Sequence, residues 1–113
     1  MKVIQSIMLT PELAKEVENL GTLLARLRLA RGVKQQEAAL RAGISRNSAY
    51  RLERGDPGLA IGQILRYLEA IAPGKTLLDL LSQADPALIT LGAQEKKRRV
   101  RDMTRAELDD LDF

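Results

Sequence analysis

Residues 32–55 constrain the fold of this 113-residue chain more than any other part. Two short helical stretches, about 35–42 and 46–54, are separated by a three-residue turn that begins with Gly43 and ends with Ser45. Glycine adopts the positive φ that a sharp turn between helices often needs, and a serine hydroxyl accepts an amide hydrogen bond at a helix N-terminus. The segment therefore predicts a helix-turn-helix.

The polar side chains of the second stretch gather on one side of a helix. At about 100° per residue, five of them fall within an arc of roughly 140°. They are Arg46, Asn47, Tyr50, Arg51 and Arg54, with Ser48 at the border and Ala49 and Leu52 opposite. Arginine pairs bidentately with guanine and asparagine with adenine, so such a face fits the DNA major groove. A merely solvated charged face is the alternative.

Positive charge is concentrated around this pair of helices. Residues 21–55 contain eight lysines and arginines and two acids, a net charge of +6, whereas the whole chain carries +3. A compact excess of positive charge is typical of a surface that binds phosphates. The charge pattern therefore favours DNA binding over simple solvation.

The composition argues against several other classes of function. The chain has no cysteine and no histidine, which removes disulfides, thiolate chemistry, the commonest general base and the commonest metal ligand. We therefore expect no enzymatic activity, no metal and no cofactor. Residues 73–76 resemble the last residues of a phosphate-binding loop, but Glu69 stands at the position where that motif requires its first glycine. No apolar run approaches 20 residues and no signal-peptide pattern begins the chain, which predicts a cytoplasmic protein.

Apolar periodicity predicts an all-α bundle of five helices with a core of leucine and isoleucine. The first helix begins with Thr10 as N-cap and Pro11 at its first position, and it ends at Gly32. Gly21 either interrupts this helix or lies within it. The fourth helix covers about 60–72, and Thr76 caps a fifth. The apolar faces expected to be buried are Leu13, Val17, Leu20, Leu24 and Leu27 in the first helix and Ile61, Ile64, Leu65, Leu68 and Ile71 in the fourth; the fifth helix contains Leu77, Leu78, Leu80 and Leu81.

We expect three parts along the chain. Residues 1–19 form an N-terminal arm and helical extension, residues 20–82 form the helix-turn-helix domain, and residues 83–113 form a basic and then acidic C-terminal tail. Within the arm, residues 1–9 are apolar-rich, and their alternation favours a strand over a docked arm.

The tail divides into three segments. One more helical turn is expected to start at Asp85 and Pro86. The run 96–101 has five basic residues in six, which either lie along DNA phosphates or form a solvated tail. Residues 104–107 then form a capping box, followed by an acidic peptide whose apolar anchors are Leu108, Leu111 and Phe113. This peptide is either a partner-binding tail or a solvated terminus.

Residues 27–81 resemble the Cro/CI-type helix-turn-helix of the Xre family, a five-helix, lambda-repressor-like DNA-binding domain. The signature residues are Gln35, Ala39, Gly43, Ser45, Leu52, Glu53 and Gly55, and the run 52–58 is most similar to HipB-type antitoxin-repressors. Two positions depart from the family pattern. Lys34 stands where threonine or serine usually caps the second helix, and Ala38 replaces a usual leucine.

The resemblance implies roles for individual residues. Base reading falls to Arg46, Asn47, Arg51 and, more weakly, Ser48; phosphate contact falls to Lys34, Gln35, Tyr50 and Arg54. Arg28 and Glu53 form a structural ion pair in this scheme. The resemblance further implies an autoregulatory repressor that binds a HipA-like kinase toxin. A stand-alone or phage-type repressor, or a protein-interaction module on the same fold, is the alternative.

One domain of this kind contacts too few base pairs to specify a single site in a genome. Two copies on half-sites about 34 Å apart roughly double the contacts, so we expect a homodimer on an inverted-repeat operator. The leucines of 77–81 and the arm 1–9 are both candidates for the dimer surface, and core packing is a further account of those leucines.

Overall fold

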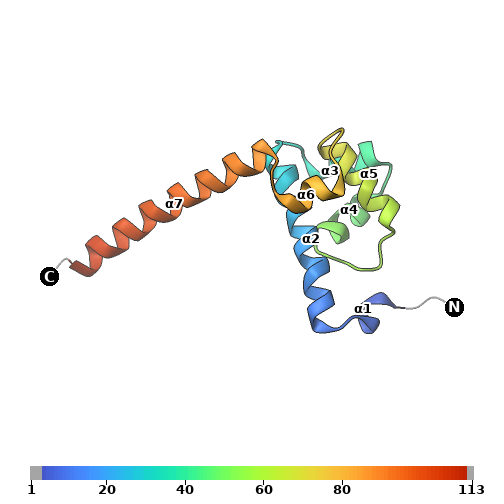
Figure 1. The fold of residues 1–113 in the computed structure, drawn as a ribbon, viewed down its shortest axis with the longest axis horizontal. Coiled ribbons are helices and arrows are strands. Elements are labelled where there is room, and N and C mark those ends of the chain that lie inside the picture. The colour runs from blue at the N-terminus through green and yellow to red at the C-terminus, as the bar shows by residue number, and fades with distance from the viewer. Residues whose placement is uncertain (1–3, 112–113) are drawn as a thin grey trace.

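The computed structural model describes the backbone of residues 4–111 and the side chains of residues 4–101. Within residues 4–111 all regular secondary structure is helical, which confirms the all-α fold class (Figure 1). The helices are α1 (Gln5–Met8), α2 (Pro11–Ala30), α3 (Gln35–Ala42), α4 (Arg46–Glu53), α5 (Ile61–Ile71), α6 (Leu77–Ser82) and α7 (Pro86–Leu111). Helices α2 to α6 are the five that periodicity predicts. None of these helices is long and apolar enough to cross a membrane.

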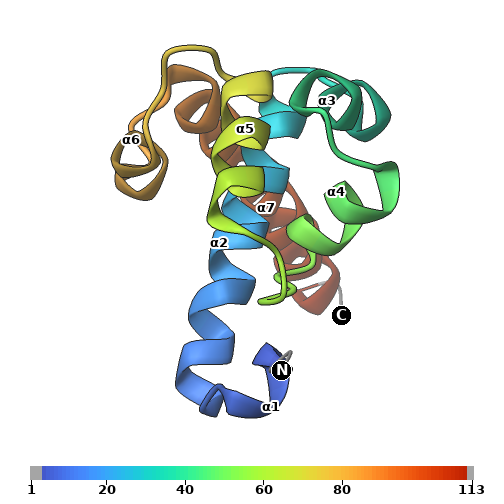
Figure 2. The ribbon, with the colours of Figure 1, turned by 90° about the vertical axis from the view of Figure 1, so that its right-hand side faces the viewer.

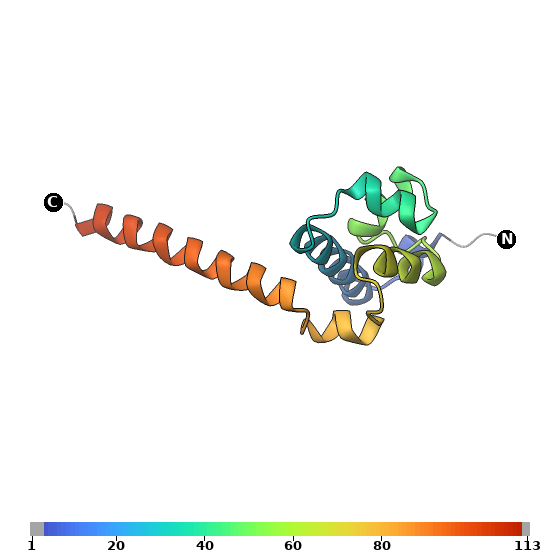
Figure 3. The ribbon, with the colours of Figure 1, turned by 90° about the horizontal axis from the view of Figure 1, so that it is seen from above.

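Helix α2 is the centre of the bundle. It packs against α4, α5, α6 and α7, and α3 packs against both α4 and α5. Figure 2 shows α5 in front, with α3 and α4 on one side and α6 on the other. Helix α7 leads away from this bundle, so the molecule is 66 Å along its longest axis (Figures 1 and 3).

The core is built mainly from leucines and from the alanines of α3 and α4. Its buried members include Leu24, Leu27, Ala38, Ala39, Ala42, Ala49, Leu52, Tyr67, Leu68, Ile71 and Leu80. The alanines let α3 approach its neighbours closely, because a small side chain keeps two backbones near each other. Ala38, where the family resemblance leads one to expect leucine, is fully buried. Among the side chains of residues 4–101, the largest that is fully buried is Tyr67 on α5, and helix α5 packs against α3.

Several expected core leucines and isoleucines lie on the surface instead. The exposed ones are Leu13, Ile61 and Leu65. In α6, Leu80 is buried while Leu78 and Leu81 are exposed, so core packing accounts for Leu80 and not for the other two. The period of an apolar pattern gives one face of a helix, but the neighbouring helices decide which arc of that face is covered. In α5 the buried residues are Tyr67, Leu68, Ala70 and Ile71, so Tyr67 and Ala70 take the place of the expected Ile61 and Leu65. Thr10 and Thr76 do cap their helices, accepting from the amides of Leu13 (3.2 Å) and Asp79 (3.1 Å).

The two ends of the chain differ from expectation. The strand expected within residues 1–9 is wrong for the described part, because Gln5–Met8 is a short helix. A strand needs a neighbouring strand for its hydrogen bonds, and residues 4–111 offer none. Helix α7 begins at Pro86 as expected, yet it continues to Leu111 through the run 96–101 and the expected fresh start at 104–107. Residues 93–111 contain no glycine or proline and are rich in strong helix formers.

Candidate nucleic-acid interface

The turn between α3 and α4 has the geometry that its sequence predicts. Gly43 lies in the left-handed region, with φ 70° and ψ 31°. Its amide donates to Leu40 O (3.2 Å), and the Ile44 amide donates to Ala39 O (3.1 Å). Ser45 then caps α4, its Oγ accepting from the Ser48 amide at 3.0 Å. These bonds satisfy backbone groups at both helix ends and fix the angle between α3 and α4.

Helix α4 presents its polar side to solvent and its apolar side to the core, as predicted. Arg46 and Asn47 in its first turn are exposed, whereas Ala49 and Leu52 are buried. Ser48 is half-buried, and its Oγ accepts a hydrogen bond from the Ser45 hydroxyl (3.0 Å). The helix is therefore held by its back, and its front remains open to a ligand.

An aromatic ring in the second turn of α4 and a guanidinium at its C-cap lie side by side. Tyr50 is half exposed, and the Cζ of Arg54 lies 5.5 Å from the centre of the Tyr50 ring. A cation at this distance from a ring face is attracted by the ring quadrupole. The contact restricts both side chains at the end of the exposed face.

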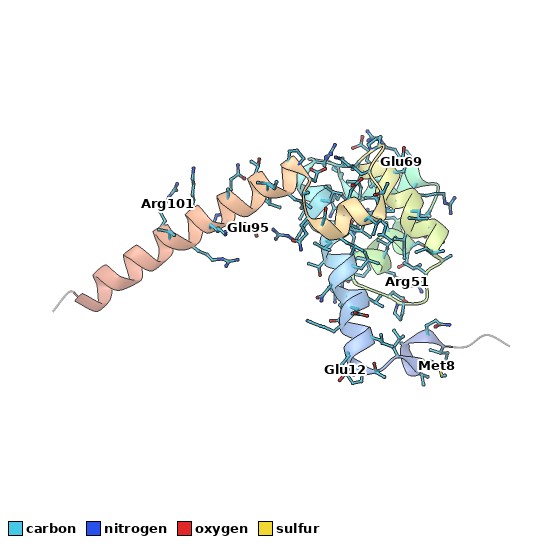
Figure 4. The ribbon with its side chains drawn as sticks, viewed as in Figure 1. Met8, Glu12, Arg51, Glu69, Glu95 and Arg101 are labelled. Atoms are coloured by element: carbon cyan, nitrogen blue, oxygen red, sulfur yellow. The ribbon has the colours of Figure 1, made fainter. Side chains whose placement is uncertain are left out.

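Arg51 is engaged by the loop that follows α4. Its Nε donates to Oδ2 of Asp56 (2.7 Å), and Oδ1 of the same carboxylate accepts from the Gly58 amide (2.8 Å). Both hydrogen bonds lower the pKa of Asp56, and the one from Arg51 has the larger effect. Figure 4 shows Arg51 beside this loop. Sequence reasoning missed this partner, although an acidic residue directly after Gly55 is the signal that could have found it.

The expected ion pair between Arg28 and Glu53 is present and has a third member. The Nε and Nη2 of Arg28 donate to the two carboxylate oxygens of Glu53, at 2.6 and 3.0 Å. The Tyr67 hydroxyl donates to the same carboxylate. Burial is the larger cause and the hydrogen bond to Glu53 the smaller cause of a raised pKa at Tyr67, so the phenol stays protonated. The side chains of Arg28 and Glu53 are only 13% and 8% exposed, and the network joins α2, α4 and α5.

The end of α4 also touches α2 backbone to backbone. A Cβ added to Gly21 in α2 would lie 2.7 Å from both the Gly55 nitrogen and the Leu52 oxygen. Gly55 itself has φ +77°, and a Cβ there would lie 2.5 Å from the Glu18 Cα. Gly21 is thus a contact position inside a continuous α2. The sequence left this point open.

At the start of α3, Lys34 and Gln35 stand next to each other. Lys34 occupies the N-cap position, and its side chain makes no capping hydrogen bond, as its lack of an acceptor requires. Lys34 is exposed and Gln35 is half-buried. The first amides of α3 and the Lys34 ammonium are therefore both available to an anion.

Two ion pairs hold α7 to α2, one between the helices themselves and one between Arg31, the C-cap of α2, and Asp85, the residue before α7. Arg26 donates two hydrogen bonds to Glu95 (2.9 and 2.5 Å), and Arg31 donates to the buried carboxylate of Asp85 (2.6 Å). Beyond Glu95 the helix projects outward, and Arg101 lies well along it (Figure 4). Of the expected tail anchors, Leu108 and Leu111 belong to the backbone of α7 and have side chains outside the described set, while Phe113 is outside the described residues altogether.

The fold and the exposed polar face of α4 define a helix-turn-helix protein of the DNA-binding class. A protein-family model described as a helix-turn-helix domain matches residues 19–81, which is more than half of the chain. The chain therefore belongs to this family. Comparisons with curated proteins and with solved structures found no match.

Proposed function

We propose that this protein is a transcriptional repressor that binds an inverted-repeat operator as a homodimer. The observation that carries the proposal is the pairing of a buried apolar back with an exposed Arg46 and Asn47 on α4. In helix-turn-helix proteins the first turn of the second helix contacts base edges in the major groove. A repressor acts by occupying DNA, and the exposed polar face of α4 is the surface that we assign to this contact.

Base reading is assigned to four residues of α4. Arg46 and Asn47 carry the donors and acceptors that match guanine and adenine edges. Arg51 uses its Nε for Asp56, so its terminal nitrogens are the ones assigned to a base. Ser48 contributes at the border of the face, where its hydroxyl already belongs to the N-cap pair.

Phosphate contact is assigned to two flanks of this face. Lys34 and Gln35 lie at the N-terminus of α3, where the helix dipole favours an anion. Tyr50 lies in the second turn of α4 and Arg54 is its C-cap residue, and the two side chains contact each other. In this scheme residues 20–82 form the DNA-binding unit, and Arg28 and Glu53 act only by fixing α4 to α2.

The finer biological role rests on sequence resemblance. The run 52–58 is similar to HipB-type antitoxin-repressors, so we propose autorepression and a HipA-like kinase toxin as a protein partner. Co-purification with the product of the neighbouring reading frame tests the toxin. A repressor that acts alone, or a protein-interaction module on the same fold, predicts no such complex, and the module also predicts no operator binding.

The decisive experiment is fluorescence anisotropy with the DNA upstream of the gene as probe. We expect Arg46→Ala and Asn47→Ala each to cost about 1–3 kcal/mol of binding free energy, and to relax base preference at one operator position. Lys15→Ala is the matched control for charge, because Lys15 is exposed in α2 and outside the proposed interface. It should change affinity only slightly, and equally for all sequences.

Two results would contradict the proposal. If Arg46→Ala and Lys15→Ala weaken binding equally, α4 does not read bases. If all sequences lose the same affinity in both α4 variants, these residues contact phosphates instead.

A further inference from the structure

The projecting part of α7 carries opposite charges in two successive segments. The basic segment, residues 96–101, contains Lys96, Lys97, Arg98, Arg99 and Arg101. The acidic segment, residues 107–110, contains Glu107, Asp109 and Asp110. Both segments lie on one continuous helix, because α7 runs from Pro86 to Leu111. For the acidic segment the structure describes the backbone.

The basic segment carries five positive charges, with Glu95 before it and Asp102 after it. All of its cations are exposed. The nearest preceding acid, Glu95, gives both carboxylate oxygens to Arg26 of α2. Like charges one helical turn apart repel each other. An anionic surface brought from outside would relieve this repulsion.

We infer that α7 pairs antiparallel with α7 of a second copy of this chain. In that arrangement the basic segment of each copy faces the acidic segment of the other. A two-fold axis then crosses α7 between Arg101 and Glu107, and the contact is self-complementary, as a symmetric dimer requires. A parallel pairing would set like charges against each other. This inference rests on the proposed function, since it names the surface that forms the repressor dimer.

The dimensions of the helix support two separate contacts. At 1.5 Å per residue, the projecting residues 96–111 span about 24 Å, or more than four turns. The middles of the two segments are about 15 Å apart along the axis, which exceeds the Debye length of about 8 Å at physiological ionic strength. Paired helices lie about 8–10 Å apart. The facing charges of a second copy therefore act more strongly than the opposite segment of the same helix.

The same helix is poorly suited to lie on DNA. The backbone of α7 is continuous through both segments. A groove or phosphate ridge that received the basic segment would also receive three carboxylates that begin less than two turns further on. The ion pairs of Arg26 and Arg31 fix the direction of α7 relative to α2. Pairing through α7 would thus set the spacing between the two α4 helices.

Charge exchange on the full chain tests the inference. The basic-swap variant is Lys96→Glu, Lys97→Glu, Arg101→Glu, and the acidic-swap variant is Glu107→Lys, Asp109→Lys, Asp110→Lys. Arg98 and Arg99 are retained because they act electrostatically on Glu95. Light scattering after size exclusion, without DNA, should give the wild type twice the 12.5 kDa mass of one chain. The measured mass of each variant alone should be half that of the wild type, which is the mass of one chain.

An equimolar mixture of the two variants supplies the control. Each variant then meets a helix of opposite pattern, so the doubled mass should return, and a fluorescent label on one variant should migrate with it. Circular dichroism of each variant checks that the helices remain. A mixture that stays at the single-chain mass overturns the inference. A wild type of single-chain mass, or either variant remaining dimeric alone, also overturns it.

The outcomes separate this inference from the proposed function. If both variants stay dimeric and still bind an inverted repeat, the α7 contact is wrong and the repressor stands. If the basic-swap variant stays dimeric but binds DNA with a shallower salt dependence, the basic segment contacts phosphates, which overturns the pairing. If Arg46→Ala binds the operator like wild type, the proposed function fails whatever mass the chain has.

Discussion

Replacing Gly21 by alanine has two opposite effects on the stability of the fold, one from local helix preference and one from tertiary packing. Gly21 lies inside α2, where alanine is favoured over glycine by about 0.8–1.0 kcal/mol. The added Cβ, however, would lie 2.7 Å from the Gly55 nitrogen, 2.7 Å from the Leu52 oxygen and 2.9 Å from the Glu53 oxygen. Local preference alone predicts a more stable protein. The structure predicts a less stable one.

The size of the effect follows from what the new methyl group meets. All three atoms are backbone atoms at the end of α4, so no side chain can rotate away to make room. Overpacking a core by a methyl group costs about 1–3 kcal/mol, occasionally more, and immovable neighbours place this case at the upper end. After subtracting the gain in helix preference, we expect Gly21→Ala to lower the free energy of unfolding by about 2 kcal/mol. That corresponds to a fall in Tm of about 10 °C.

Urea unfolding followed by circular dichroism at 222 nm measures the effect. Gly92→Ala is the matched control, because Gly92 also lies within a helix and an added Cβ there meets nothing within 4 Å. The control should leave the midpoint unchanged or raise it. Operator affinity should fall in Gly21→Ala alone, since the end of α4 must move. A Gly21→Ala protein as stable as wild type would refute the close approach of α2 and α4.

Three further perturbations test other contacts. Ser45→Ala removes the cap of α4 and should cost about 1 kcal/mol in urea unfolding, with a smaller loss for Ser45→Asn, which keeps an acceptor. The lowered pKa of Asp56 contributes stability above the ordinary value of 3.8 that is lost as the pH falls through the folded value. The Tm of Asp56→Asn should therefore decline less than that of wild type between pH 5 and pH 2.5, and parallel curves would contradict this. Arg31→Met leaves the buried carboxylate of Asp85 without its cation and should cost about 1–3 kcal/mol, which Asp85→Asn in the same chain should partly restore.

Elements whose causes are local could be predicted from the sequence. The turn at Gly43, the cap at Ser45 and the opposed faces of α4 depend on residues within a few positions of each other, and the structure has them as predicted. The ion pair of Arg28 and Glu53 was also foreseen, but only through resemblance to a family, because nothing local joins residues 25 positions apart.

Tertiary structure decided whatever depends on a distant neighbour. The burial of Tyr67 instead of Ile61 depends on which side of α5 the helices α2 and α3 cover. The role of Gly21 depends on the approach of Gly55, and the place of α7 depends on Arg26 and Arg31. Periodicity reports that a helix has an apolar face. Only packing fixes which part of that face is removed from water, because the free energy of burial belongs to pairs of surfaces and not to one segment.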